Sequence, residues 1–210
     1  MNDILAAGAR ALGVDLDRDA PSRLMAYLSL LRKWNRTHNL TAIVEPEKMI
    51  TRHLLDSLSV VPHLPVKPKL RVADVGSGGG LPGIPLAICR PDWRLTLIDS
   101  NQKKAAFLRQ AVIELALANV EVVCARSESY RPPLAFEVAI SRAYSSLRNF
   151  VLQGRHLVAP AGRLFAMKAA YPKDEIDSLP SGIRMFDAVR LHVPGIEAER
   201  CLIIMESVDA

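Results

Sequence analysis

The sequence predicts an α/β fold with a mostly parallel sheet, an antiparallel last strand and a helical N-terminal extension. From Leu70 onward, short β-rich runs alternate with segments of helical spacing, as in right-handed β-α-β units. The last two β-rich runs have little helix between them, which favours an antiparallel hairpin at one edge of the sheet. Apolar side chains recur at helical spacing before that. We therefore expect a helical extension over 1–66 and a sheet domain over 67–210.

The extension is expected to contain two helices and a linker. The first helix begins near Asp19 and Pro21, and one face carries the apolar stripe Leu24, Tyr27, Leu28, Leu31 and Trp34. A stripe at this spacing indicates core packing. A second helix is expected from about Pro46 to Leu58, and three prolines between Pro62 and Pro68 predict the linker into the sheet.

The expected strands of the sheet domain are short and rich in apolar residues. They cover Leu70 to Val75, Arg94 to Ile98, Val120 to Cys124, Val138 to Ser141, Arg163 to Lys168, Arg184 to Val193 and Cys201 to Val208. Ser100 is expected to cap a helix that runs to about Ala118, and another helix is expected near Ser146 to Leu157. Ligands of such sheets bind beyond the carboxyl ends of the strands, so the residues that follow each strand are the candidates for a site.

The composition fits a protein with a sizeable core and says little about partners. The 210 residues are 50% hydrophobic, and no apolar run approaches the roughly 20 residues that span a bilayer. No secretory signal is visible, and Cys89, Cys124 and Cys201 lack metal-binding spacing. We therefore expect a cytoplasmic monomer with reduced thiols and no metal. A net charge of +5 permits a nucleic-acid partner without proving one.

The most informative segment is the glycine-dense loop that follows the first strand. Glycine allows positive φ and close approach to a ligand, so a loop of this kind between a strand and a helix is typical of a nucleotide cradle. The dinucleotide pattern G-x-G-x-x-G fails when started at Gly76, because its third glycine falls on Leu81. Started at Gly78 it fits, through Gly80 and Gly83, but the loop then begins too far beyond the strand.

A second pattern, D-x-G-x-G-x-G, is met completely by Asp74, Gly76, Gly78 and Gly80. It resembles the first motif of class I S-adenosylmethionine (SAM) methyltransferases. A tight turn without a ligand seldom needs so many glycines. The loop therefore favours SAM over a nicotinamide dinucleotide.

Polar residues also follow the second and third strands. Asp99 lies about 20 residues beyond the loop, where an acid accepts hydrogen bonds from ribose hydroxyls, although NAD enzymes carry an acid there too. Its alternative role is a helix cap or first-turn acid. Ser127 and Glu128 follow the third strand, where an adenine would lie, and a solvated loop acid is the alternative for Glu128.

The fourth strand ends in Ile140-Ser141-Arg142-Ala143. Enzymes that methylate exocyclic amino groups of bases usually carry N-P-P-Y or D-P-P-Y there, and methylation of cytosine C5 needs a nucleophilic cysteine. Both are absent at this point of the sequence. These absences narrow the chemistry, while Arg142 could also be a plain surface charge.

On the residues described above, the chain resembles the RsmG (GidB) family, which comprises bacterial small-subunit rRNA guanine-N7 methyltransferases. The resemblance covers nearly the whole chain and depends on Trp34-Asn35, Asn39-Leu40-Thr41, Arg52 to Leu58, Asp74 to Pro85, Asp99-Ser100, Lys103-Lys104, Phe107-Leu108 and Ile140 to Ala143. One departure is Met167-Lys168-Ala169, where the family commonly has L-K-G. The resemblance implies a Rossmann-like class I SAM methyltransferase fold, with Gly76, Leu81, Ser127, Glu128 and Arg142 where the family contacts SAM.

The resemblance also implies a reaction, the methylation of guanine N7 in the 530 loop of 16S rRNA, as naked RNA or within a small ribosomal subunit. N7 has a lone pair and no proton, so its methylation needs alignment of the reactants and no general base. Arg142 is the candidate catalytic residue, either orienting guanine, whose N7 and O6 pair with arginine, or forming the pocket wall. A splayed base could stack on Trp34 or Tyr144.

Basic residues are the candidates for binding the RNA backbone. Those expected to rim the predicted cleft are Arg32, Lys33, Arg36, Arg52, His53, Lys103, Lys104 and Lys168, with Arg126 as a weaker candidate. Solvated surface charge is the alternative for most of them. His53 could equally be a satisfied helix histidine, and Arg52 could form a helix ion pair with Asp56.

Other functions remain open at this point. They are a SAM methyltransferase acting on another RNA, a protein or a small molecule, an NAD(P)-dependent oxidoreductase, and a noncatalytic RNA-binding assembly factor. The glycine spacing argues against the oxidoreductase, and the intact loop argues against the noncatalytic protein.

Overall fold

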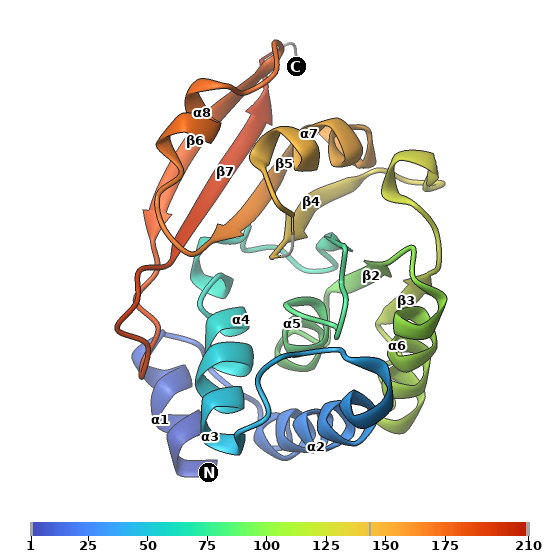
Figure 1. Ribbon diagram of the computed structural model, residues 1–210, viewed down its shortest axis with the longest axis vertical. Helices are drawn as coiled ribbons and strands as arrows, with labels where there is room; N and C mark the ends of the chain where they lie inside the picture. The colour runs from blue at the N-terminus through green and yellow to red at the C-terminus, as the bar shows by residue number, and fades with distance from the viewer. Residues whose placement is uncertain (1, 143, 209–210) are drawn as a thin grey trace.

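Seven strands form one sheet in the computed structural model, which describes residues 2–142 and 144–208 (Figure 1). The strand order is β3-β2-β1-β4-β5-β7-β6, and β7 runs antiparallel to both of its neighbours while the other strands are parallel. The strands are β1 (Arg71–Val75), β2 (Arg94–Ile98), β3 (Val120–Val123), β4 (Phe136–Ser141), β5 (Val158–Lys168), β6 (Ile183–Arg190) and β7 (Cys201–Ser207). The predicted fold class and the closing hairpin are confirmed, with β7 inserted between β5 and β6.

Alternate residues of the strands point to opposite faces, and each face is covered by helices. Val72 and Ile140 face an apolar cluster formed with α2 (Ala20–His38), α5 (Gly83–Cys89) and α6 (Gln102–Glu114). Ala73 and Ala139 face a second cluster formed with α7 (Leu147–Gly154). In Figure 1 the first group of helices lies below the sheet and α7 above it. Because both faces are covered, the strands are buried and read as nearly continuous apolar runs.

The N-terminal helices share their core with the sheet. Tyr27 and Leu31 of α2 belong to the same buried cluster as Leu97 of β2 and Phe107 of α6. A further helix, α1 (Asn2–Ala11), precedes α2 and was not predicted. The division of the chain at residues 66 and 67 stays a prediction.

The predicted helix from Pro46 to Leu58 is present but irregular. It consists of α3 (Pro46–Met49), a π-helical segment η1 (Ile50–Leu55) and α4 (Asp56–Leu58). Widened turns of this type are frequent at functional sites. Their presence here matters because Arg52 and Asp56 both belong to the site described below.

Several predicted boundaries are wrong by a few residues. The cap of α6 is Asn101, not Ser100, because the Asn101 side chain accepts hydrogen bonds from the backbone N–H groups of Lys103 and Lys104 at 2.9 and 3.2 Å. The same helix ends at Glu114 rather than Ala118, and Ala116 adopts a positive φ of 47° just beyond it. The short elements are η2 (Val61–His63), η3 (Ser127–Ser129), η4 (Arg155–Leu157) and α8 (Lys173–Asp177).

Within the described ranges 2–142 and 144–208, no helix has the combination of length and apolar character that crossing a membrane requires.

The close contact between β1 and α5 gives a test of the packing. A Cβ on Gly83 would collide with the Leu97 side chain and lie 2.6 Å from Asp74 Oδ2. We expect Gly83→Ala to destabilise the protein by about 2 kcal/mol, as overpacking of a core does. Urea denaturation measures it, with Gly154→Ala as the control, because a Cβ there meets Phe150 at an ordinary 3.4 Å. Equal stability of the two variants would contradict this account of the β1–α5 contact.

Candidate functional site

The glycine loop after β1 adopts a backbone that other residues rarely allow. Gly76, Gly78 and Gly80 have φ values of 74°, 56° and 86°. The loop is held to the next strand, because the N–H groups of Gly76 and Ser77 donate to the carbonyl of Ile98 at 2.8 and 3.1 Å. The alternate glycines identified in the sequence therefore meet a conformational requirement.

Asp74 lies at the end of β1 beneath this loop and is fully buried. Its Oδ2 accepts a hydrogen bond from the Gly83 N–H at 2.9 Å, whereas its Oδ1 has no partner within the described residues. Burial raises the pKa of the carboxyl to about 7, against the opposing effects of the Gly83 N–H, Arg142 and Ser77. An unpartnered buried oxygen is costly, so this acid is suited to a ligand that supplies a donor or a positive charge.

The N-terminal extension holds the loop from the other side. The buried hydroxyl of Tyr27 in α2 donates to the carbonyl of Gly79 at 2.5 Å, and burial raises the pKa of this hydroxyl. A Cβ on Gly79 would lie 3.2 Å from Leu31 and 3.5 Å from the carbonyl of Leu40. The loop is therefore fixed between β1 and α2.

Asp99, at the end of β2, also binds the loop. Its Oδ2 accepts from the Gly78 N–H at 2.9 Å and its Oδ1 from the Asn101 N–H at 2.8 Å. A carboxylate has about four acceptor positions, so capacity remains for further donors such as hydroxyls. Asp99 thus stabilises the turn between β2 and α6, while Asn101 caps the helix.

A polar cavity of about 420 Å³ lies beside these residues. Its lining includes Gly76, Ile98, Asp99, Lys104, Arg126, Ser127, Glu128, Tyr144, Asn149 and Gln153. Tyr144 fixes one wall, because its hydroxyl lies 2.9 Å from Ser127 Oγ and donates to Gln153 Oε1 at 3.0 Å. We call this the donor cavity. A glycine cradle, an acid at the end of β2, a polar lining and the unpartnered oxygen of Asp74 fit a nucleoside cosubstrate such as SAM.

Four residues expected to bind SAM lie outside the donor cavity's lining, namely Gly78, Gly80, Leu81 and Arg142, and the fully buried Asp74 does not line it either. Leu81 is buried in the apolar cluster, and its N–H donates to the Ser77 carbonyl at 3.1 Å. Arg142 lines a different pocket. The two regions are nevertheless neighbours, since Asp74 pairs with Ile140 in register and the two chains continue from there to Gly76 and Arg142.

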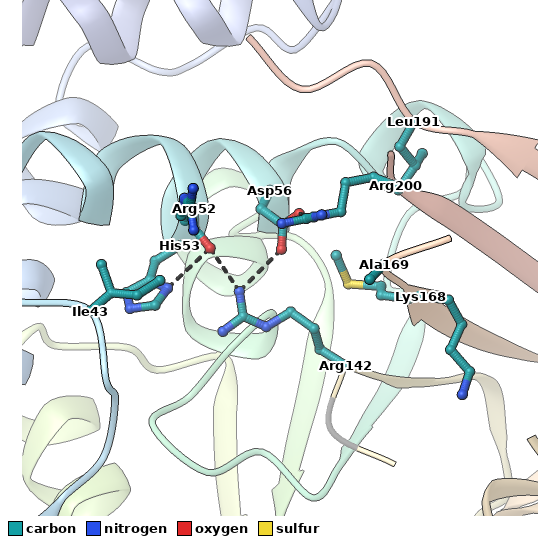
Figure 2. Close-up of a pocket in the computed structure, with 10 residues that line it drawn as sticks. Ile43, Arg52, His53, Asp56, Arg142, Lys168, Ala169, Leu191 and Arg200 are labelled. Carbon is teal, nitrogen blue, oxygen red and sulfur yellow. Dashed lines mark hydrogen bonds and ion pairs between the residues drawn. The ribbon is translucent and has the colours of Figure 1, made fainter. Parts of the chain in front are cut away.

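A second pocket, of about 260 Å³, has charged residues as half of its lining, and four of these five are basic (Figure 2). We call it the cationic pocket, and its lining is Ile43, Arg52, His53, Asp56, Arg142, Met167, Lys168, Ala169, Leu191 and Arg200. These residues come from the loop after α2, the irregular helix 46–58, the ends of β4 and β5, and the β6–β7 connection. None of them lines the donor cavity.

Asp56 is the centre of the cationic pocket. Only 6% of its side chain is exposed, and its two oxygens are each bound by an arginine: Oδ2 by Arg142 Nη1 and Oδ1 by Arg200 Nε, both at 3.1 Å. Arg142 Nη1 also donates to the carbonyl of Arg52 at 3.0 Å, as Figure 2 shows. The alternative of a helix ion pair between Arg52 and Asp56 is therefore wrong, because arginines next to β4 and β7 occupy the carboxylate.

His53 is buried and fully hydrogen-bonded. Its Nδ1 lies 3.0 Å from the Arg52 carbonyl and therefore donates, which leaves Nε2 to accept from the Thr41 hydroxyl at 2.8 Å. Burial and the nearby Arg142 lower the pKa of His53 to about 4. His53 is thus neutral at pH 7 and joins the loop after α2 to the helix, in agreement with the alternative of a satisfied helix histidine.

The remaining basic candidates are not all at the two cavities, because Arg32, Lys33 and Arg36 of α2 line a separate surface pocket. Arg52 and Lys168 line the cationic pocket, although Lys168 pairs with Glu175 at 2.8 Å and points away from Asp56 in Figure 2. Lys104 and Arg126 line the donor cavity, and Lys103 is exposed beside them on α6. Arg200 was not predicted, because its partner lies 144 residues away in the sequence.

The two aromatic candidates for base stacking lie in different surroundings. Trp34 packs on Phe107, with 5.8 Å between ring centroids, and belongs to the edge of the core. Tyr144 lines the donor cavity. Neither aromatic ring lines the cationic pocket.

Comparison with known structures supports the fold assignment. A SAM-dependent methyltransferase from Aquifex aeolicus matches with a TM-score of 0.58 and 18% identity, over 83% of this chain and 97% of that one. TrmN from Thermus thermophilus also matches with a TM-score of 0.58, at 16% identity over 76% of this chain and 53% of that one. At these identities the likeness shows a shared class I methyltransferase fold.

Sequence comparison is more specific. The GidB family model, described as rRNA small subunit methyltransferase G, matches residues 21–204. Proteins named ribosomal RNA small subunit methyltransferase G are 50% identical in Burkholderia multivorans, over 95% of this chain and 90% of that protein, and 48% identical in Laribacter hongkongensis, over 97% of both. The chain therefore belongs to the rRNA small subunit methyltransferase G (GidB) family of SAM-dependent methyltransferases.

Proposed function

We propose that this enzyme transfers the methyl group of SAM to N7 of a guanine in the 530 loop of 16S rRNA. The observation that carries the proposal is the pair of adjoining sites at the ends of β1 and β4, one a polar glycine cradle and the other a cationic pocket. A methyltransferase for RNA needs one site for the methyl donor and one for a polyanion. Membership of the family supports the choice of small-subunit rRNA.

On the donor side, SAM would supply an electrophilic methyl group on a sulfonium. The backbone of Gly76, Gly78, Gly80 and Leu81 would form the cradle, and Asp99 would accept from the ribose hydroxyls. Ser127 and Glu128 would border the adenine, since both line the donor cavity and follow β3. The buried Asp74 adds an acid close to a cationic cosubstrate, which its unpartnered oxygen favours.

On the acceptor side, guanine N7 has a lone pair and no proton to lose, so the enzyme needs no general base. Its task is alignment of N7 with the methyl group. Arg142 would orient the base by donating to O6, which leaves the N7 lone pair available. Because Arg142 shares the negative charge of Asp56 with Arg200, the positive charge that its guanidinium places beside a base that becomes cationic is reduced.

Arg52, Lys103, Lys104, Arg126 and Lys168 would bind the RNA backbone around these two sites. His53, being neutral, would contribute by fixing the Arg52 carbonyl that holds Arg142. We propose a cytoplasmic monomer that acts on 16S rRNA or the small ribosomal subunit.

The direct test uses methyl-labelled SAM and small-subunit rRNA from a strain that lacks the modification. We expect one labelled position, a guanine methylated at N7 in the 530 loop, detected by N7-specific cleavage of the RNA backbone. Label on another base or atom would overturn the proposed specificity. Transfer to a small molecule, or RNA binding without transfer, would support the rival functions instead.

Replacement of Arg142 separates its two possible roles. We expect Arg142→Gln to lower kcat about 100-fold through misalignment of the base, with an unchanged Kd for SAM. Arg148→Gln is the matched control, since Arg148 is an exposed arginine of α7 outside both cavities. A weaker Kd for SAM with normal kcat would assign Arg142 to the methyl donor.

The pKa of Asp74 predicts a pH dependence of SAM binding. Binding should strengthen about tenfold between about pH 6 and about pH 8, because the ionised carboxylate attracts the cationic cosubstrate. Arg142, Ser77 and the Gly83 N–H favour the ionised form and Asp99 opposes it. The Asp74→Asn variant should bind SAM more weakly than the wild type. Because this variant lacks the Asp74 carboxyl, any pH dependence that it retains comes from other groups, including SAM itself. Isothermal titration calorimetry measures the SAM affinity of the wild type and of Asp74→Asn across this pH range. Identical pH profiles of the two proteins would contradict a role for Asp74 in SAM binding.

The same pKa also predicts that the protein without ligand loses stability as the pH rises from Asp74's ordinary 3.8 towards about 7. Stability falls with rising pH because the folded state holds the Asp74 proton more tightly than the unfolded chain does, and this advantage is lost as the carboxyl ionises. Urea denaturation across this range should show a smaller decline in Asp74→Asn. An equal decline would exclude Asp74 as its source.

A further inference from the structure

Arg200 is held in the cationic pocket by two contacts that fix the plane of its guanidinium group. Its Nε donates to Asp56 Oδ1 at 3.1 Å, and its Nη1 donates to the carbonyl of Glu199 at 2.8 Å. Only 22% of the side chain is exposed. Nη2 has no hydrogen-bond partner within ranges 2–142 and 144–208. An arginine held in this way is prepared to bind a further acceptor at little entropic cost.

The charges around Arg200 do not balance. Asp56 is one carboxylate shared by two arginines, Arg142 and Arg200, and Arg52 lines the same pocket. His53 adds no charge to offset them, and Lys168 is already paired with Glu175. A half-buried pocket with this excess of positive charge is suited to an oxyanion.

Two oxyanions are available to the enzyme, the phosphodiesters of RNA and the carboxylate of SAM. The position of Arg200 favours RNA. It lies in the connection between β6 and β7 and lines the cationic pocket but not the donor cavity. Its guanidinium and that of Arg142 approach Asp56 from opposite ends, as Figure 2 shows.

We propose that Arg200 binds a phosphodiester of the RNA next to the target base, and that Asp56 is a positioning residue that keeps Arg200 and Arg142 at a fixed separation. This inference rests on the proposed RNA substrate. It adds a phosphate subsite to the pocket in which Arg142 orients the base. Asp56 does not touch the RNA and acts through the two arginines.

The test of the phosphate subsite is RNA binding by Arg200→Gln. Loss of one charge-assisted hydrogen bond should weaken binding of a 530-loop transcript about tenfold, with a twofold or smaller change in the Kd for SAM. The slope of log K against log salt should fall by roughly 0.7. The control is Arg184→Gln, a carboxylate-paired arginine of the same hairpin that lies roughly 20 Å further along the strands.

The test of positioning is Asp56→Asn, which removes a negative charge from an anion-binding pocket. If Asp56 were only a counter-charge, RNA would bind more tightly to this variant. Positioning predicts the opposite sign, about tenfold weaker RNA binding, because both arginines lose their fixed orientation. Arg200→Lys provides a second test that leaves the buried acid in place, and it should weaken binding about threefold although the charge is kept.

The outcomes are decisive for the inference and separate from the proposed function. Normal RNA affinity in Arg200→Gln, or a loss of SAM affinity without a loss of RNA affinity, overturns the phosphate subsite. Tighter binding in Asp56→Asn, or wild-type binding in Arg200→Lys, overturns positioning. Because these measurements use binding alone, they hold even if methylation maps to another atom. Failure of the wild-type protein to bind both the transcript and the small ribosomal subunit would defeat the proposed function itself.

Discussion

The hydrogen bond between the buried carboxylate of Asp74 and the backbone N–H of Gly83 is the constraint on which the donor site depends. It joins the end of β1 to the start of α5 and closes the glycine loop between them. The loop then accepts a hydrogen bond from the Tyr27 hydroxyl of α2 and donates hydrogen bonds to the carbonyl of Ile98 in β2. The unpartnered oxygen of Asp74 costs stability in the free protein, and the proposed binding of a cationic cosubstrate would offset this cost.

The N-terminal extension is part of both sites. Through Tyr27 it fixes the glycine loop, and through Thr41 and His53 it fixes the Arg52 carbonyl that holds Arg142. The irregular helix 46–58 then supplies Asp56, to which the β4 end and the β6–β7 connection are tied. Alignment of two substrates across these segments requires rigid contacts between them, since the proposed chemistry uses position in place of a general base.

Much of this arrangement was predictable from the sequence, because it follows from local patterns. The alternation of strands and helices predicted the sheet and its closing hairpin. The spacing of Asp74 and the three glycines predicted a loop in which the glycines adopt positive φ. The contacts between distant residues were not predictable. No local signal in Glu199-Arg200 reveals a partner in Asp56, and the burial that makes His53 neutral depends on tertiary packing. The sequence could not decide between Ser100 and Asn101 as the N-cap of α6, because serine and asparagine cap helices about equally well; in the structure the cap is Asn101.

The central claim is that methyl donor and RNA occupy separate, adjoining sites. A crystal structure of the protein with S-adenosylhomocysteine, the product left by SAM, tests it most directly. The account predicts the adenosine in the donor cavity, with its ribose at Asp99 and its adenine beside Ser127 and Glu128, and the cationic pocket left for RNA. Adenosine bound instead between Arg142 and Arg200 would contradict the account.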